Sequence, residues 1–526
     1  MRRLRQPADH GKNIQTEAVL SSIPMTPSAA PAAAPAGALV RRIGLLAAIA
    51  VLLLVLLLPE QAGLPRSGQV MLAILAFAVI VWMTEALDYA VSAVVIAALM
   101  VFLLAFVPDA AKPAAGAMGT GSALTLALSG FSSSAVTLVA AALFIAAAMT
   151  ATGLDRRIAL RVLTRMKAQP NSIVIGAMVV GFLLAFIVPS ATARAACLMP
   201  IMIGFIHAFG AERRSRFAAL LVITAAQTVS IWNIGIKTAA AQNMVAIGFL
   251  EKQLGAGITW TDWFVAGAPY SALMTVALYF IMTRMLRPEV QEIAGGTSAI
   301  REQLAALGPM TGAQWKLLVL VLALLAFWST EGLLHRFDTT STTVAAIALM
   351  MLPGIGVMDW KASQKGFPWG TVVLFAVGIS VGSALLKTQA ASWLANLIVT
   401  HLGLQQASAF AILMLLSLFL IVIHLGFASA TALASTMIPI VMSVLSTVQT
   451  PGINVIGMTM LLQFVVSIGF ILPVNSPQAM IAYGTDTFDA KDFVRTGLVL
   501  TVAAIALLVL FSLTYWPWMG YMTTAR

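Results

Sequence analysis

Long apolar runs separated by short polar segments make up most of the chain. Runs of about 20 apolar residues match an α-helix that crosses a hydrocarbon core roughly 30 Å thick. The chain lacks the alternation of apolar and polar residues that marks the strands of a membrane barrel. We therefore predict an all-α polytopic membrane protein with about 11 transmembrane helices. The predicted spans lie near 43–59, 69–86, 89–108, 134–152, 216–235, 262–286, 315–334, 342–357, 369–387, 454–473 and 496–517.

Two further apolar segments are interrupted near their middle. Residues 172–209 and 406–447 each consist of two apolar half-lengths that flank a short stretch of small and hydroxyl-bearing residues. We interpret each segment as a re-entrant helix hairpin. Interrupted helices at matching places in the two halves of a chain are typical of transporter binding sites. The pattern thus predicts a transporter with one hairpin in each half.

Short sequences from the first half return in the second half in the same order. Trp-Met-Thr-Glu at 82–85 is echoed 246 residues later by Trp-Ser-Thr-Glu at 328–331. Ser-Ala-Thr-Ala at 190–193 recurs 239 residues later at 429–432, and each copy has a proline ten residues after its serine. Such ordered echoes predict a duplicated unit.

These features divide the chain into five parts. The Pro- and Ala-rich start lacks an apolar stripe, which favours a disordered cytoplasmic tail. The predicted parts are the tail 1–38, a first transmembrane helix within 39–68, a first repeat 69–290 with hairpin 172–209, a cytoplasmic linker 291–314, and a second repeat 315–526 with hairpin 406–447.

Basic residues in the loops set the predicted orientation, because cytoplasmic loops carry an excess of Lys and Arg. Six basic residues precede the first span, which places the N-terminus in the cytoplasm of a bacterial inner membrane protein. An odd number of spans separates the starts of the two repeats, so the second repeat is inverted relative to the first. The two hairpins then enter from opposite sides, and their tips meet near the midplane.

Composition excludes several functional classes. Hydrophobic residues make up 60% of the chain and charged residues only 9%, so its surface faces the lipid bilayer. The net charge of +11 resides in short loops, which argues against a nucleic-acid partner. The single cysteine and the five histidines have no metal-ligand spacing. No HExxH or P-loop motif occurs, so we do not predict an enzyme or a cofactor.

The hairpin tips carry the strongest candidate chemistry. Ser and Thr at a helix start accept hydrogen bonds from free backbone N–H groups, and the start itself has a positive dipole end that suits a carboxylate. Two opposed tips therefore fit a molecule with two carboxylates. The tip residues are Ser190, Ala191 and Thr192 in the first repeat and Ser429, Ala430 and Thr431 in the second. The alternative is that these small residues serve helix packing alone.

Several other polar residues interrupt predicted spans and are candidates for the site. Charged residues at membrane depth are costly and often functional. Arg194 and Lys237 are each either a counter-charge for substrate or part of a structural pair, and Lys237 is alternatively a fixed charge that stands in for a coupling cation. His424 is either a titrating group or a buried structural histidine. The remaining candidates are Gln242 and Asn243 in the first repeat and Asn475, Ser476 and Pro477 in the second, where a simple proline kink is the alternative.

The chain resembles the divalent anion/sodium symporter family of dicarboxylate, citrate and sulfate carriers. The resemblance runs from about residue 69 to 520 and rests on stretches such as 82–85, 153–159, 368–370 and 472–477. Pro-Ser-x-Thr-Ala-Arg at 189–194 is similar to the branch of 2-oxoglutarate/malate translocators and citrate/succinate antiporters. The resemblance implies an elevator mechanism, a homodimer, and carboxylate binding at both tips.

Four positions depart from the sodium-coupled members of that family. Ala191 and Ala430 stand where the family has Asn in its Ser-Asn-Thr tips, and Phe186 and Leu425 stand where a hydroxyl residue is usual. Both changes remove oxygen ligands, so a metal site is reduced to a weak Na⁺ candidate near Ser190 and Ser429. We therefore expect a carrier of C4–C5 dicarboxylates that works by exchange. The alternatives are Na⁺- or H⁺-coupled symport of di- or tricarboxylates or sulfate, and a passive anion channel.

Overall fold

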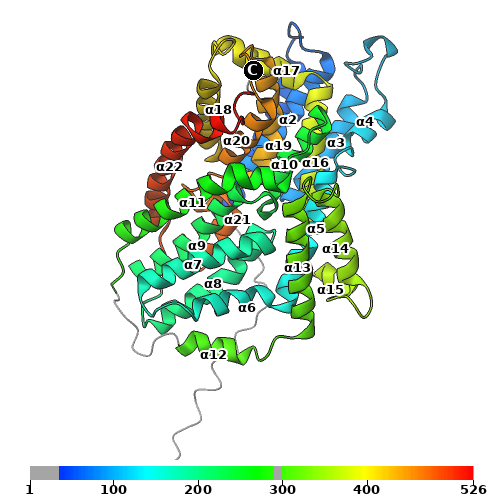
Figure 1. The fold of residues 1–526 in the computed structure, drawn as a ribbon. Coiled ribbons are helices and arrows are strands. Elements are labelled where there is room, and N and C mark those ends of the chain that lie inside the picture. The colour runs from blue at the N-terminus through cyan, green and yellow to red at the C-terminus, as the bar shows by residue number, and fades with distance from the viewer. Residues whose placement is uncertain (1–34, 290–297, 366, 525–526) are drawn as a thin grey trace, which may run out of the picture.

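A computed structural model describes residues 35–289, 298–365 and 367–524, and within these ranges the regular elements are helices, with no strand (Figure 1). Eleven of the described helices are long and apolar enough to cross a membrane. The prediction of an all-α, multi-pass membrane protein is therefore confirmed.

The helices of span length are distributed over both halves of the chain. They are α1 (Pro35–Leu57), α2 (Arg66–Thr84), α5 (Ser134–Thr152), α7 (Pro170–Ile187), α8 (Ala191–Ala208), α9 (Arg216–Gly235), α11 (Trp260–Met285), α13 (Gly312–Thr330), α16 (Trp369–Lys387), α19 (Ala430–Thr447) and α22 (Ala490–Leu513), which continues into α23 (Tyr515–Trp518).

Shorter helices complete the described fold. The apolar ones are α3 (Tyr89–Leu104), α14 (Thr339–Met351), α18 (Ala409–His424) and α20 (Val455–Val466). The others are α4 (Thr120–Ala127), α6 (Leu154–Leu163), α10 (Ala241–Leu254), α12 (Ser298–Ala306), α15 (Trp360–Lys365), α17 (Ala390–His401) and α21 (Pro477–Tyr483), with 3-10 turns η1 (Pro113–Ala115), η2 (Lys237–Ala239) and η3 (Pro473–Asn475).

The set of long helices differs from the predicted spans. The segments near 89–108, 342–357 and 454–473 form short helices instead of full spans. Pro353 follows the end of α14 by two residues, where a proline favours the end of a helix, whereas α3 and α20 end four and seven residues before the next proline. Three hairpin halves, α7, α8 and α19, reach span length in their place.

Most of the predicted tail and part of the predicted linker lie outside the described residues. Residues 1–34 of the predicted tail lie outside the described residues, and the first helix begins at Pro35. Residues 291–297 of the predicted linker also lie outside them. The part that follows contains α12, and the buried Arg157 of α6 donates to the carbonyls of Leu307 and Gly308 just beyond its end.

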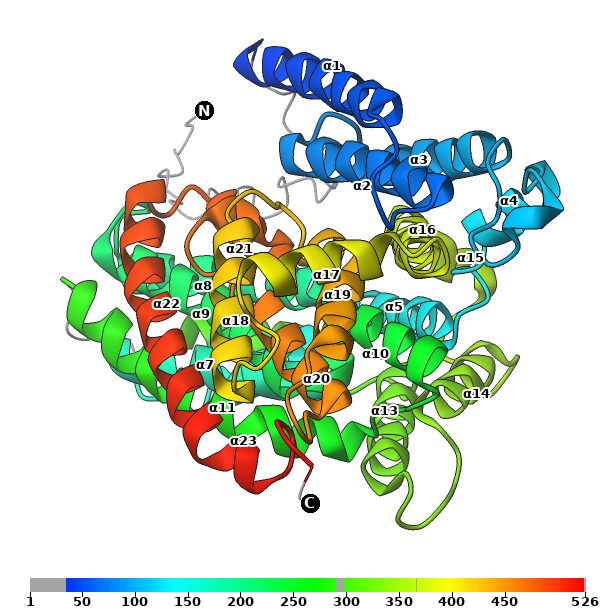
Figure 2. The same cartoon turned by 90° about the horizontal axis from the view of Figure 1, so that it is seen from above.

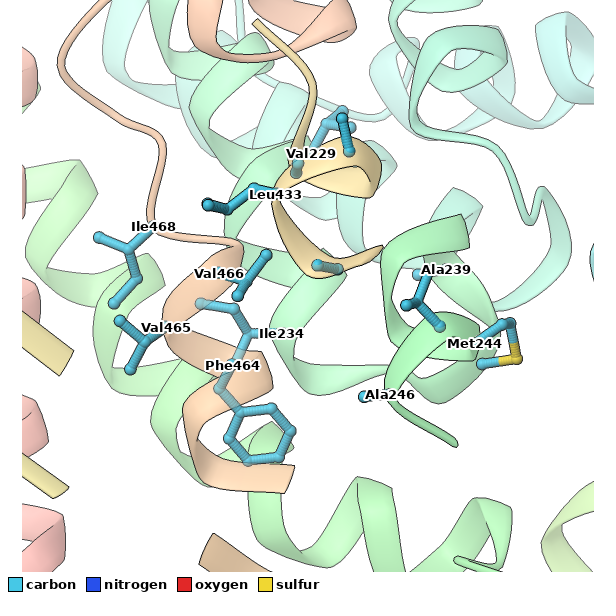
Figure 3. Packing of buried hydrophobic residues seen from close by; sticks show 14 of the residues in the cluster. Val229, Ile234, Ala239, Met244, Ala246, Leu433, Phe464, Val465, Val466 and Ile468 are labelled. Atoms are coloured by element: carbon cyan, nitrogen blue, oxygen red, sulfur yellow. The ribbon is translucent and has the colours of Figure 1, made fainter. Parts of the chain in front are cut away.

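The centre of the molecule is built around α9, which is buried along its whole apolar length. It packs against α7, α8 and α11, while α1 and α2 lie together at the periphery (Figure 2). Close packing joins the two halves, because Ile234 near the end of α9 lies beside Phe464 and Val465 near the end of α20 (Figure 3). The ends of α9 and α20, one from each half of the chain, therefore meet in the core.

Candidate substrate-binding site

Both interrupted segments contain a real break followed by a capped helix start. Ser190 is extended, with φ −150°, and its hydroxyl accepts from the amide of Ala193 at 3.2 Å. Ser429 is likewise extended, with φ −139°, and accepts from Ala432 at 3.3 Å. In each case the two amides between the cap and its donor have no acceptor within the helix. Those free donors are available to an anion.

A second pair of breaks lies beside the tips. In the first half η2 is followed by the extended Ala240 and then by α10. In the second half η3 is followed by the extended Ser476 and then by α21. The two sets are 236 residues apart throughout, so the same order of 3-10 turn, extended residue and helix occurs in both halves of the chain.

One cavity of about 860 Å³ is lined by both tips and by both second breaks. Of the residues singled out from sequence, the following line it: Ser190, Ala191, Thr192, Gln242, Ser429, Ala430, Thr431, Ser476 and Pro477. The hydroxyl oxygen of Ser476 is buried and has no hydrogen-bond partner. The structure thus brings the two tips together around unused polar groups.

The rest of the cavity wall is mainly apolar. Small residues of α5, including Ala147 and Ala151, form one side. Glu85, just after α2, and Tyr89, at the start of α3, form another. Glu85 carries the acidic side chain among the lining residues, and none of those residues is Lys or Arg. The attraction for an anion must therefore come from helix starts and hydroxyls.

The structure places five other candidates outside the set of lining residues: Arg194, Lys237, Asn243, His424 and Asn475. Arg194 is fully buried, and its Nη2 donates to Asn233 Oδ1 at 2.5 Å and to the Ala239 carbonyl at 2.9 Å. It therefore joins α8 to the break between α9 and α10. It holds the first tip in place without lining the cavity.

Asn243 and Asn475 support the breaks in the backbone. Asn475 Nδ2 donates to the carbonyls of His424 at 2.7 Å and Phe427 at 3.0 Å, the residues where α18 ends. His424 Nε2 lies 3.3 Å from the Asn475 carbonyl. Asn243 Nδ2 donates to the Asn233 carbonyl at 2.8 Å and contacts that of Lys237 at 3.3 Å. Buried carbonyls released by a helix break need such donors.

Lys237 points to a different part of the structure. Its Nζ donates to the Ile258 carbonyl at 2.6 Å and lies 3.4 Å from the hydroxyl of Thr339. With 3% of its surface exposed, this residue of η2 is buried against the start of α14. It therefore has no direct contact with the cavity.

Among the amide side chains that line the cavity, the sequence analysis did not single out Asn233 and Gln478. Gln478 Nε2 donates to Ser230 Oγ at 2.9 Å, and Gln242 Nε2 donates to Ser467 Oγ at 3.4 Å. The two glutamines are 236 residues apart in the sequence. Each one donates to a serine in the other half of the chain. Extending the repeat offset past the tips would have identified Gln478.

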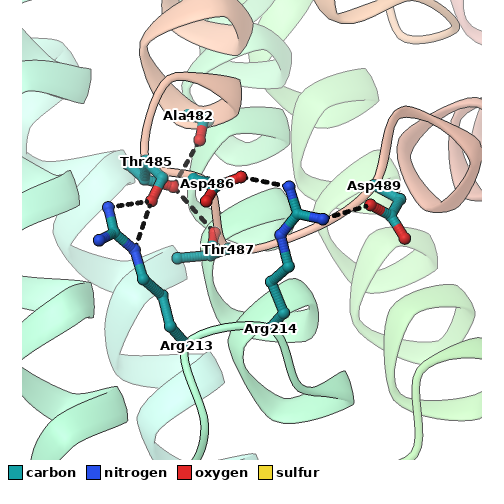
Figure 4. Close-up of polar contacts among 7 residues, drawn as sticks. All are labelled: Arg213, Arg214, Ala482, Thr485, Asp486, Thr487 and Asp489. Carbon is teal, nitrogen blue, oxygen red and sulfur yellow. Dashed lines mark hydrogen bonds and ion pairs between the residues drawn. The ribbon is translucent and has the colours of Figure 1, made fainter.

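A cluster of polar contacts joins the loop between α8 and α9 to the loop between α21 and α22 (Figure 4). Arg213 donates through Nε and Nη2 to the Thr485 carbonyl, at 3.1 and 2.8 Å. Arg214 pairs with Asp486 and, at 3.2 Å, with Asp489. The hydrogen bond from Arg214 holds the pKa of Asp486 below its usual range. These contacts link the two helices that carry Thr192 and Gln478 into the cavity.

No group of three or more His, Cys, Asp or Glu side chains gathers in the described part of the chain. The weak Na⁺ candidate near Ser190 and Ser429 does not depend on such a group and stays a prediction.

Comparison with known proteins gives consistent results. The family model described as the sodium:sulfate symporter transmembrane region matches residues 39–522. A "Membrane protein" of Cupriavidus necator is 51% identical and covers 93% of this chain and 95% of its own length. The citrate/succinate antiporter of Escherichia coli is 26% identical, with 90% and 97% covered. MtrF of Neisseria gonorrhoeae, from a class of antimetabolite efflux pumps, has a similar fold, with TM-score 0.55, 16% identity, and 83% and 95% covered.

Proposed function

Because this chain belongs to the family of the sodium:sulfate symporter transmembrane region, we propose that it is a secondary carrier that exchanges C4–C5 dicarboxylates across a bacterial plasma membrane. The antiporter relative is a transporter and not an enzyme. A transport function agrees with a cavity that is lined by both helix-hairpin tips. The expected elevator motion, the inverted repeats and the homodimer are parts of the same proposal.

The observation that carries the proposal is the pairing of two capped helix starts in one cavity. The starts at Ser190 and Ser429 offer free amides and hydroxyls, and the lining includes no basic side chain. A fixed cation would hold a single anion strongly, whereas two helix starts hold two carboxylates moderately and release them. The unpartnered hydroxyl of Ser476 adds a donor near the second tip.

Exchange is favoured by what surrounds the tips. The ring of Phe186, which stands at a position where a hydroxyl is usual in sodium-coupled carriers, packs 5.1 Å from that of Phe182 and 5.9 Å from that of Phe264. An aromatic cluster supplies no oxygen ligand to Na⁺. The citrate/succinate antiporter of Escherichia coli is named as an exchanger, which supports the same mode for this chain.

The cavity is proposed to open to the cytoplasm. Its outer wall includes Glu85 after the end of α2, Ala151 near the end of α5, and Ala362 in α15. The bias of basic residues predicts that all three helix ends lie on the cytoplasmic side, together with the N-terminus.

Transport by purified protein in proteoliposomes tests the proposal. Radiolabelled succinate should enter only when succinate, malate or citrate is loaded inside, and uptake should saturate. Uptake into empty vesicles driven by a sodium or proton gradient would replace exchange by symport. Flux that neither saturates nor shows counterflow would indicate a channel. The double variant Ser190→Ala, Ser429→Ala is the control, because it removes both caps and should abolish saturable uptake.

A further inference from the structure

Lys237 and its neighbours form a polar cluster that the binding site does not use. Besides donating to the Ile258 carbonyl, Lys237 Nζ lies 3.4 Å from Thr339 Oγ1. The Thr339 hydroxyl in turn donates to Glu331 Oε2 at 2.6 Å. The cluster thus joins η2, which belongs to the broken core, to the ends of α13 and α14.

This cluster lies on the side of the molecule opposite the cavity wall formed by α15. Thr339 is the first residue of α14, whereas Ala362 of the cavity wall lies in α15, which follows the other end of α14 (Figure 1). Lys237 is buried, and because the cavity is proposed to open at α15, its contact with Thr339 lies on the side opposite that opening.

The repeat provides an equivalent on the open side. Trp82 donates to Ser92 Oγ at 2.9 Å, and its counterpart Trp328 donates to Thr343 Oγ1 at 3.2 Å, so the two helix ends have the same construction. Glu85 and Glu331 follow these tryptophans at the same spacing. Glu85 lines the open cavity, whereas Glu331 lies in the cluster with Lys237.

The two halves differ at the position of Lys237. The residue 236 positions after Lys237 is Pro473, at the start of η3. A proline offers neither a charge nor an amide hydrogen to Glu85. Lys237 therefore gives the side of α14 that begins at Thr339 a contact with a charged donor. Glu85, on the side of the cavity opening, has no such lysine at the matching position.

Lys237 is also connected to the cavity through its backbone. Asn243 Nδ2 contacts the carbonyls of both Asn233 and Lys237, and the Asn233 side chain accepts from Arg194 beside the first tip. A substrate that engages the first tip and Asn233 therefore acts on the segment that carries Lys237. Binding can shift an equilibrium only through such a differential contact.

We propose that Lys237, Thr339 and Glu331 form a latch that holds the empty carrier closed on one side, so that reorientation requires bound anion and transport is restricted to exchange. This inference rests on the proposed function and names the residues that impose its mode. A hydrogen bond from a charged donor, once lost, changes an equilibrium by about tenfold or more. Without the latch, the empty carrier should reorient by about that factor faster.

Efflux from proteoliposomes loaded with labelled succinate tests the latch. Wild-type protein should release succinate only when an anion is present outside. Lys237→Met and Thr339→Val should each raise release into anion-free buffer by about tenfold, with exchange rates within about threefold of wild type. Lys237→Met combined with Thr339→Val should show no more than the single effect, because both disrupt one contact. Lys112→Met, at an exposed loop lysine, is the matched control and should behave as wild type.

Each contrary outcome has one meaning. If wild-type protein exchanges but both variants still require external anion, the latch is refuted and the proposed function stands. If the variants still gain thermal stability from succinate but no longer transport, Lys237 is needed for movement, which also refutes the latch. If wild-type protein does not exchange, the proposed function fails.

A labelling experiment tests the latch without transport. In a Cys197→Ser background, Ala151→Cys places one thiol at an exposed position of the cavity wall. A membrane-impermeant maleimide should label it from the open side, and adding Lys237→Met should reduce the labelling rate because the latched state is less populated. An unchanged rate would overturn the proposal, whatever the transport assays give.

Discussion

Replacing Asn475 by Ala should destabilise the second tip and weaken substrate binding, although Asn475 is not among the residues that line the cavity. The side chain is 1% exposed, and its Nδ2 donates to the carbonyls of His424 and Phe427. The His424 carbonyl also accepts from the Phe427 amide at 3.0 Å, so the substitution leaves the Phe427 carbonyl without a donor, which costs about 1–3 kcal/mol. The loss falls on the turn that leads to Ser429, so the position of that helix start should change.

Thermal unfolding of purified protein, followed by tryptophan fluorescence with and without succinate, gives both quantities. Asn475→Ala should unfold at a lower temperature and lose most of the stabilisation that succinate gives to wild type through mass action. Asn454→Ala is the matched control, because Asn454 Nδ2 also donates to a carbonyl, that of Gly520, and its Oδ1 accepts from Gly457, far from the tips. That variant should lose stability but keep the succinate effect.

Two results would refute this reasoning about Asn475. If Asn475→Ala unfolds as wild type does and still responds fully to succinate, the backbone contacts are unimportant. If it keeps its stability and loses only the succinate effect, Asn475 contacts substrate directly, as the sequence alone led us to expect.

Three further changes have defined outcomes. Ser190→Ala removes the cap of α8 and should cost about 1 kcal/mol of stability with slower succinate exchange, measured by unfolding and by transport. Gly382→Ala should destabilise by about 1–3 kcal/mol in thermal unfolding, because its Cβ would lie 2.3 Å from a phenylalanine ring, whereas Gly121→Ala, with open space, should not. The stability difference between wild type and Asp486→Asn should be present at neutral pH and vanish in a pH series that passes below the lowered pKa of Asp486, because the pair with Arg214 requires the ionised carboxyl.

The broken hairpins and their tips could be predicted from sequence because their signals are local. An apolar run interrupted by Ser-Ala-Thr at 190–192, with a second copy at 429–431, restricts the chain to a few conformations in lipid, where every backbone group needs a partner. The structure has breaks at both places and brings the two tips into one cavity. Duplication supplied the evidence that a single tripeptide lacks.

The direction of a polar side chain was not predictable in the same way. Asn475 and Ser476 are neighbours in one interrupted span, yet Ser476 faces the cavity and Asn475 holds the backbone of the other segment. Both positions have the same composition and the same break around them. The direction of each side chain depends on the position of the carbonyls that follow α18, about 50 residues earlier in the chain. No local sequence pattern predicts that position.

The differences between the two copies are as informative as their similarities. The hydroxyl residues of the tips are duplicated, which suits a substrate that has a carboxylate at each end. The buried cations are not duplicated: Leu433 stands opposite Arg194 in the tip alignment, and Pro473 stands opposite Lys237. A pair of identical half-sites can bind a dicarboxylate in either orientation, but it gives the two closed states of a carrier equal stability. Any preference for one state must then arise where the copies differ, and the contact of Lys237 with the start of α14 is such a place.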